Sequence, residues 1–303
     1  MDEEIKQLGR AFLVTLVVLI VQLIGFQLSG SLALLGDSAH VFSDIIAIGA
    51  SLLAVWLALR APTGRRTFGF HRFEVLAAFL NGMLLVAMSL LIAYEAVQRL
   101  NGATYAINSV PMLVTSLVGL AGNVYVAYHL QHEENLNTRS AFIHAAGDAL
   151  SSVGVLIGAV LIMITGLVVI DIIVSLLIAS IILFSAYTIL RGSLSILIES
   201  APYGVDAERV KLAVQCIDGV KGVHDIHIWR TCSDLVFAMM HIETDNIPLV
   251  MTRPIQSDIE EKLHHEFQIT HVTIQFEPVG CSCENQKMCN MLEHGRKKRK
   301  HTH

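Results

Sequence analysis

Long apolar runs separated by short polar connections dominate the first 190 residues of the chain. A helix needs about 20 apolar residues to cross the hydrocarbon core of a bilayer. Six runs approach or exceed this length, and they predict membrane-spanning helices at 11–28, 36–58, 76–97, 111–130, 142–164 and 169–190. No comparable run follows residue 191. The pattern therefore predicts a membrane α-helical fold, with a six-helix transmembrane domain at 1–191.

The remaining residues form a mixed polar segment in which apolar and polar side chains alternate over 223–229 and 271–276. Alternation with a period of two is typical of half-buried strands. We expect a helix at 205–217, strands at 223–230 and 235–243, a helix at 254–267 and a strand at 271–277. This αββαβ order predicts a ferredoxin-like α+β domain at 192–280, with an antiparallel-type sheet and helices on one face. A basic tail containing cysteines follows at 281–303.

Composition and charge support a membrane protein and suggest its orientation. Hydrophobic residues make up 53% of the chain, charged residues only 16%, and the mean hydropathy is +0.59. Lys and Arg accumulate in cytoplasmic loops. The second connection holds Arg60, Arg65, Arg66 and Arg72, and the fourth holds Arg139. Both chain ends are therefore expected in the cytoplasm, and the short loops suggest a bacterial inner membrane.

Two His/Asp pairs stand inside the apolar runs: His40 with Asp44, and His144 with Asp148. Residues at i and i+4 lie on one face of a helix. Two such helices facing each other would supply two imidazoles and two carboxylates, a set that suits tetrahedral zinc better than calcium or magnesium. Ionisable groups at bilayer depth commonly mark a transport path. Cadmium, cobalt, nickel, ferrous iron and manganese remain alternatives as cargo, and Asp37 either orients a ligand or caps its helix.

The C-terminal segment is rich in zinc-type ligands. They are His224, His241, His271, Glu277, Cys281, Cys283 and Cys289. An antiparallel pairing of the strands would bring His224, His241 and Glu277 to one edge. His227 alternates with Asp225 and Trp229 and is interpreted as structural. The alternative is a His-rich domain that holds no metal.

Three segments resemble the signature motifs of cation diffusion facilitators of the zinc-transporter type. They are 36–44 (GDSAHVFSD), 67–74 (TFGFHRFE) and 141–148 (AFIHAAGD). The resemblance implies a homodimer that exports Zn(II) in exchange for protons, with the transport site on the second and fifth spans. It also implies a zinc site at His224, His241 and Glu277, a second from His271 with the tail cysteines, and a loop site at His71. His at position 40 implies zinc selectivity, because manganese carriers of the family usually have Asp there.

Metal ligands must be deprotonated, so protons compete with zinc for the two imidazoles and can couple to transport. Zinc in the C-terminal domain would be structural or regulatory. The rival to a transporter is a membrane-anchored zinc sensor; a zinc hydrolase is disfavoured because the sequence lacks His-Glu-x-x-His. The basic run 296–300 is expected to be solvated and to touch anionic membrane lipid. The net charge of −5 and the lack of a basic stripe argue against nucleic acid.

Overall fold

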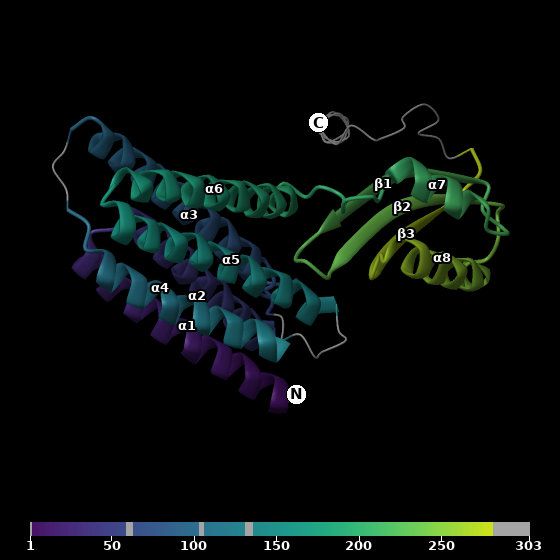
Figure 1. Cartoon of the computed structure of the whole chain (residues 1–303). Coiled ribbons are helices and arrows are strands. Elements are labelled where there is room, and N and C mark those ends of the chain that lie inside the picture. Colours follow the sequence, from purple (N-terminus) through teal and green to yellow (C-terminus); the bar gives the residue numbers. More distant parts are fainter. Residues whose placement is uncertain (1, 59–62, 103–105, 131–135, 281–303) are drawn as a thin grey trace. The chain divides into compact units, whose positions relative to one another are not determined.

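The computed structural model describes residues 2–58, 63–102, 106–130 and 136–280 (Figure 1). Side chains are described over a smaller part of the chain, which excludes those of 136–146. The chain divides into two compact units, Met1–Arg191 and Gly192–His303. The first is helical and the second contains a sheet.

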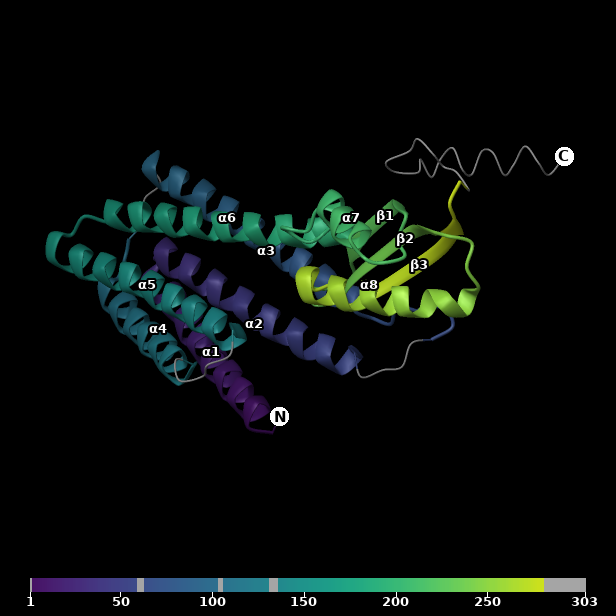
Figure 2. The same ribbon diagram turned by 90° about the vertical axis from the view of Figure 1, so that its right-hand side faces the viewer.

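Six long helices account for the apolar runs, which confirms the expected helical membrane fold. They are α1 (Asp2–Ser29), α2 (Leu32–Ala58), α3 (Arg72–Leu100), α4 (Ser109–Leu130), α5 (Leu136–Thr165) and α6 (Val169–Leu197). Within the described ranges each is long and apolar enough to cross a membrane. Helix α1 packs against α2 and α4, α4 packs against α5, and α2 packs against α3 (Figures 1 and 2).

Polar side chains are buried inside the bundle, and large apolar side chains cover its outer faces. Large apolar side chains such as Leu80, Leu91 and Phe184 are exposed on it, as suits contact with lipid. The buried polar side chains include Gln22, Asp37, Ser38, Ser43, Asn81, Asn123, Asp148, Ser152 and Asp171. Because no water is available in a bilayer core, such groups must find partners on their own or on neighbouring helices. Polar bonds between helices therefore fix how the bundle packs.

Glycines bring α1 and α4 close together. A Cβ atom added at Gly25 would overlap Thr115 of α4, and one added at Gly122 would overlap Val18 of α1. Small residues allow the backbones of membrane helices to approach closely. Such close packing matters because apolar burial alone gives helices little preference for each other over lipid.

Asp171, the third residue of α6, caps the first turn of α2. Its carboxylate accepts hydrogen bonds from the backbone N–H groups of Leu32 (2.9 Å) and Ala33 (3.3 Å) and from the Ser31 hydroxyl (2.5 Å). Ser31 in turn accepts a bond from the Leu34 N–H at 3.1 Å. The otherwise unpaired donors at the start of α2 are thus satisfied, and the negative charge lies at the positive end of the helix dipole.

Arg99 of α3 joins the same cluster. Its Nη1 donates to the Gly30 carbonyl oxygen at 2.8 Å and lies 3.8 Å from Asp171 Oδ2. Gly30 has a φ of +70°, the left-handed conformation that ends α1 and starts the turn into α2. The α1–α2 turn is therefore tied to both α3 and α6.

The C-terminal unit has the expected αββαβ order. It contains α7 (Ala207–Gln215), β1 (Gly222–Arg230), β2 (Val236–Thr244), a short 3₁₀ turn (Leu249–Met251), α8 (Thr252–Phe267) and β3 (His271–Pro278). Val210 and Val214 of α7 and Ile259 and Leu263 of α8 pack with apolar strand residues into one core. Both helices thus cover one face of the sheet.

The sheet is mixed, so the expectation of an antiparallel-type sheet was wrong for β3. Strand order is β1-β2-β3; β1 and β2 are antiparallel, while β2 and β3 are parallel. A two-stranded hairpin needs only a short turn, but α8 lies between β2 and β3 and carries the chain back across the sheet. Such a helical crossover returns the next strand in the same direction.

A β-bulge in β1 brings His224 onto the face that carries His227. The expected grouping of His227 with Trp229 holds, since they pair with Met239 and Phe237 of β2. The pairing shifts between His224 and His227, and Asp225 has a φ of +52°. The extra residue changes the phase of the alternation. His224 pairs with His241 and His227 with Met239, so His224 and His227 share the sheet face opposite the helices. Strict alternation would have placed them on opposite faces.

Replacing Asp171 with Ala should destabilise the bundle. The change leaves the first N–H groups of α2 without an acceptor, and loss of a helix cap typically costs roughly 1–2 kcal/mol. The melting temperature of Asp171→Asn should lie between those of the native chain and Asp171→Ala, since an amide oxygen can still cap a helix. Thermal unfolding of the detergent-solubilised chain measures the order. Ser175→Ala, which removes only a hydroxyl bonded within α6, is the control, and equal melting temperatures for all four proteins would contradict the capping role.

Candidate metal-binding sites

Three of the four intramembrane ligands suggested by the sequence meet inside the bundle. His40 and Asp44 lie one turn apart on α2, and Asp148 reaches them from α5. Ligand atoms of the three side chains all lie within 4.8 Å of one another, and His40 Nε2 is 2.8 Å from Asp148 Oδ1. Asp148 is buried and the other two are half-buried. Two helices thus supply an imidazole and two carboxylates at one point.

The fourth suggested ligand, His144, is on α5 one turn before Asp148. Its side chain lies outside the described residues. On a helix, i and i+4 share a face, so the backbone places His144 on the face of α5 that carries Asp148. Its participation stays a prediction.

Other buried polar groups in the bundle form bonds between helices. Asn81 of α3 donates to the backbone and side-chain oxygens of Ser43, next to Asp44 on α2. Asp37, one turn before His40, is almost fully buried and accepts three hydrogen bonds from α1 and α5. It therefore does not cap α2, since its side chain bonds to other helices.

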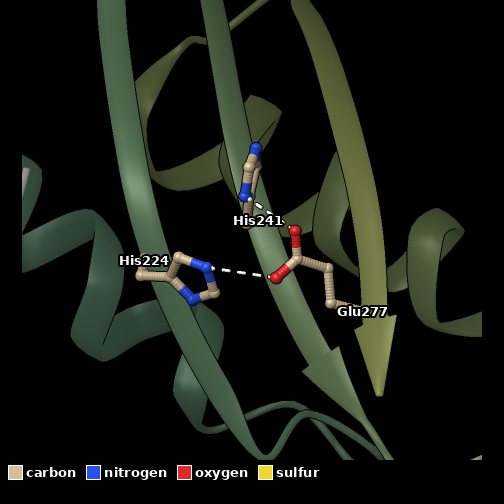
Figure 3. Close-up of side chains that lie close together, drawn as sticks. All are labelled: His224, His241 and Glu277. Atoms are coloured by element: carbon tan, nitrogen blue, oxygen red, sulfur yellow. Dashed lines mark ion pairs between the residues drawn. The ribbon is translucent and has the colours of Figure 1, made fainter. Parts of the chain in front are cut away.

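A second cluster lies in the C-terminal domain, on the sheet face not covered by helices. His224, His241 and Glu277 come from the three strands and point toward one another (Figure 3). Glu277 Oε2 is 3.3 Å from His224 Nε2, and Glu277 Oε1 is 3.0 Å from His241 Nδ1. The parallel pairing of β2 and β3 is what brings His241 and Glu277 together, because both stand near the carboxyl ends of their strands. An antiparallel β3 would have separated them.

These donors fit a zinc ion. Two imidazole nitrogens and a carboxylate oxygen lie within 4.8 Å of one another, and these are ligand types that zinc prefers at a spacing that one ion could bridge. His224 Nε2 is buried and makes no hydrogen bond of good geometry, as expected of an atom positioned for a metal. Two further carboxylates, which the sequence pattern did not indicate as ligands, lie next to these histidines. Glu243 Oε1 is 3.4 Å from His224 Nδ1, and Asp225 Oδ2 is 3.7 Å from His241 Nε2.

The bulge explains why Asp225 was missed. Aspartate tolerates positive φ better than most residues, and here that conformation brings its carboxylate next to His227 Nε2, at 3.0 Å, as well as next to His241. The sequence signal, an Asp between two histidines in His-Asp-Ile-His, is visible only if a bulge is expected.

Two of the remaining suggested ligands, His271 and His71, are described and are not brought into these clusters. His271 starts β3, six residues from Glu277 and hence roughly 20 Å along the strand, and its ring packs 5.2 Å from that of Phe237. His71 precedes α3 and belongs to neither group of three potential ligands found among the described side chains. Cys281, Cys283 and Cys289 lie outside the described residues.

Family comparisons cover both units. Residues 8–198 match the family model described as the cation efflux transmembrane domain, and residues 202–279 match the cytoplasmic domain of cation efflux proteins. Together these ranges include all the described elements from the second turn of α1 to β3.

Bacterial transporters are similar over most of their length. The chain is 35% identical to a cadmium, cobalt and zinc/H(+)-K(+) antiporter of Bacillus subtilis (strain 168), covering 94% of this chain and 92% of the relative. It is 36% identical to the zinc transporter ZitB of Escherichia coli (strain K12), covering 92% and 90%. It is 35% identical to the metal cation efflux system protein CzcD of Cupriavidus metallidurans (strain ATCC 43123 / DSM 2839 / NBRC 102507 / CH34), covering 91% and 87%. The chain is a multi-pass membrane protein of the cation efflux family, a transporter and not an enzyme.

Proposed function

We propose that this transporter exports zinc from the cytoplasm and holds it with His40, Asp44, His144 and Asp148. The observation that carries the proposal is the meeting of His40, Asp44 and Asp148 inside a bundle with apolar outer faces. Such groups are expensive in a membrane and rarely lack a function. Two imidazoles with two carboxylates suit tetrahedral zinc. The names of several relatives, which include zinc, support this cargo.

Other divalent metals are the nearest alternative. The same nitrogen and oxygen ligands accept cadmium, cobalt, nickel or ferrous iron. The Bacillus relative is named for cadmium and cobalt as well as zinc, which supports a range of cargo. An imidazole at position 40 favours these borderline metals over manganese, which prefers oxygen ligands.

Protons provide the counter-ion in this proposal. The contact of 2.8 Å between His40 Nε2 and Asp148 Oδ1 occupies two atoms that zinc would need. Zinc and a proton therefore compete for the same lone pairs. Zinc enters from the cytoplasm, the site turns outward by alternating access, and protons from the other side displace the metal. The name of the Bacillus relative includes both H(+) and K(+), so potassium is a second counter-ion to test.

We further propose a homodimer in a bacterial inner membrane with both chain ends in the cytoplasm. The arginines of the second and fourth connections support this orientation. The match of 202–279 to a cytoplasmic domain supports it independently. Zinc at His224, His241 and Glu277 would connect three strands of that domain, and it would stabilise or regulate the transporter.

Removing a carboxylate from the membrane site should abolish zinc flux. In proteoliposomes with an imposed proton gradient, Asp148→Ala and Asp44→Ala are expected to reduce flux to the level of empty vesicles, because each loses one of four ligands. Asp206→Asn, an exposed carboxylate in the C-terminal domain, serves as the matched control. The sensor alternative predicts no zinc flux even from the native chain, with the response to zinc retained in both membrane variants and lost on replacing His241 and Glu277.

Proton coupling predicts that the size and direction of the pH gradient control zinc flux. Zinc should move toward the acidic compartment, since protons there displace it, and a protonophore should stop net movement. Repeating the assay with a potassium gradient and valinomycin separates the two counter-ions. Zinc flux that ignores both gradients would contradict antiport while leaving zinc transport itself intact.

Bound zinc should fall when the C-terminal cluster is disrupted. The full-length chain carrying His241→Ala or Glu277→Gln is expected to lose about one zinc ion per chain at low free zinc, because a three-ligand set cannot spare a member. Elemental analysis after dialysis against a weak chelator measures this. His265→Ala, an exposed histidine on α8, is the control, and native zinc content in the first two variants would rule the site out.

A further inference from the structure

A group of buried polar side chains lies one helical turn from the transport site. Asp37, on α2, is only 1% exposed. Its Oδ2 accepts hydrogen bonds from Gln22 Nε2 of α1 at 2.5 Å and from the Ser152 hydroxyl of α5 at 3.1 Å, and its Oδ1 accepts one from the Ser151 hydroxyl at 2.9 Å. Neutral donors on two other helices therefore replace the water that this carboxylate would have outside the membrane.

The contacts between α2 and α5 form two successive rungs. One is His40 to Asp148, and the other is Asp37 to Ser151 and Ser152. Asp37 precedes His40 by three residues on α2, whereas its partners follow Asp148 by three and four residues on α5. The two helices therefore run in opposite directions, and both rungs lie on the sides that face each other. The second rung does not involve a ligand of the proposed metal site.

The group extends to α4. Asn123 Nδ2 donates to the Ser152 hydroxyl at 3.1 Å, and Gly119 leaves room for the Gln22 amide, because an added Cβ there would lie 2.6 Å from Gln22 Nε2. Asp37 is thus the common acceptor of a network reaching α1, α2, α4 and α5. Bonds of this kind resist sliding of one helix along another, since a shift breaks them with no water to replace them.

We propose that Asp37 is a positioning residue that fixes the register of α2 against α5 and thereby the metal selectivity of the transport site. The inference rests on the proposed role of His40, Asp44 and Asp148. A helix rises 1.5 Å per residue, whereas metal–ligand distances tolerate only about ±0.2 Å. A register shift of a fraction of one residue therefore changes which cation radius the site fits.

Zinc and cadmium affinities of the full-length chain in detergent test the inference without requiring transport. A His241→Ala, Glu277→Gln background removes metal from the C-terminal cluster, and competition with a fluorescent chelator gives both dissociation constants. Asp37→Ala is expected to weaken zinc binding about tenfold and to weaken the binding of the larger cadmium ion less. The ratio of the two affinities is the decisive readout, because a partly unfolded sample would lower both metal occupancies together.

A double-mutant cycle assigns the effect to the second rung. Ser151→Ala with Ser152→Ala should reproduce the change in the zinc-to-cadmium ratio, and adding Asp37→Ala should change it little further, since the contacts of Asp37 with α5 are already gone and only its bond to Gln22 of α1 remains to be lost. Ser89→Ala and Ser175→Ala are matched controls, because within the described part of the chain these buried hydroxyls bond to carbonyls of their own helices. Additive effects, or a native ratio in the folded Asp37→Ala protein, would overturn the inference.

Asp37→Asn separates positioning from direct coordination. Gln22 Oε1 is buried without a hydrogen-bond partner among the described residues, so the Gln22 amide can turn and accept a bond from the introduced amide. Positioning predicts affinities close to native for this variant. A loss equal to that of Asp37→Ala would identify Asp37 as a metal ligand and refute the positioning role. If the Asp37 variants change the affinity ratio as expected but the native chain shows no zinc flux, only the proposed transport function is refuted.

Discussion

A carboxylate buried among membrane helices is stable only where other groups take the place of water. Three carboxylates in the described part of the bundle are buried, and each one has partners on another helix. Asp171 satisfies the first turn of α2, Asp37 accepts bonds from α1 and α5, and Asp148 faces His40. The same requirement thus generates the packing of the helices and the geometry of the proposed metal site. Apolar side chains pack between the helices, but lipid solvates them almost equally well, so they specify the arrangement less sharply than the polar bonds do.

Helix α2 carries most of these constraints. Its start is capped by Asp171 and tied to Arg99 through the preceding turn, its next buried turn is held by Asp37, and His40 follows one turn later. Because His40 and Asp44, the proposed ligands, come after these two contact points on the same helix, our proposal holds that their positions relative to α5 are set before any metal binds. Pre-positioned ligands lower the ordering cost of binding and sharpen discrimination between cations of different radius.

The C-terminal domain reaches a similar ligand set by a different route. There the ligands lie on a sheet face, and strand direction decides whether they meet. The crossover through α8 makes β3 parallel to β2, so Glu277 ends beside His241, and the bulge at Asp225 turns β1 so that His224 and His227 share a face. This cluster is less buried than Asp148 in the bundle.

The sequence by itself determined the six helices, the αββαβ order and the pairing of His40 with Asp44, because hydrophobic period and helical spacing are local properties. It also suggested His224, His241 and Glu277 as ligands. It did not reveal that Asp171 caps another helix, that Asp37 bonds to Ser151 and Ser152, or that β3 runs parallel to β2. These features join residues far apart in the chain, and the bulge at Asp225 depends on a single backbone angle that alternation cannot detect. Only the tertiary structure decided them, since which distant donors meet a buried carboxylate is a consequence of packing.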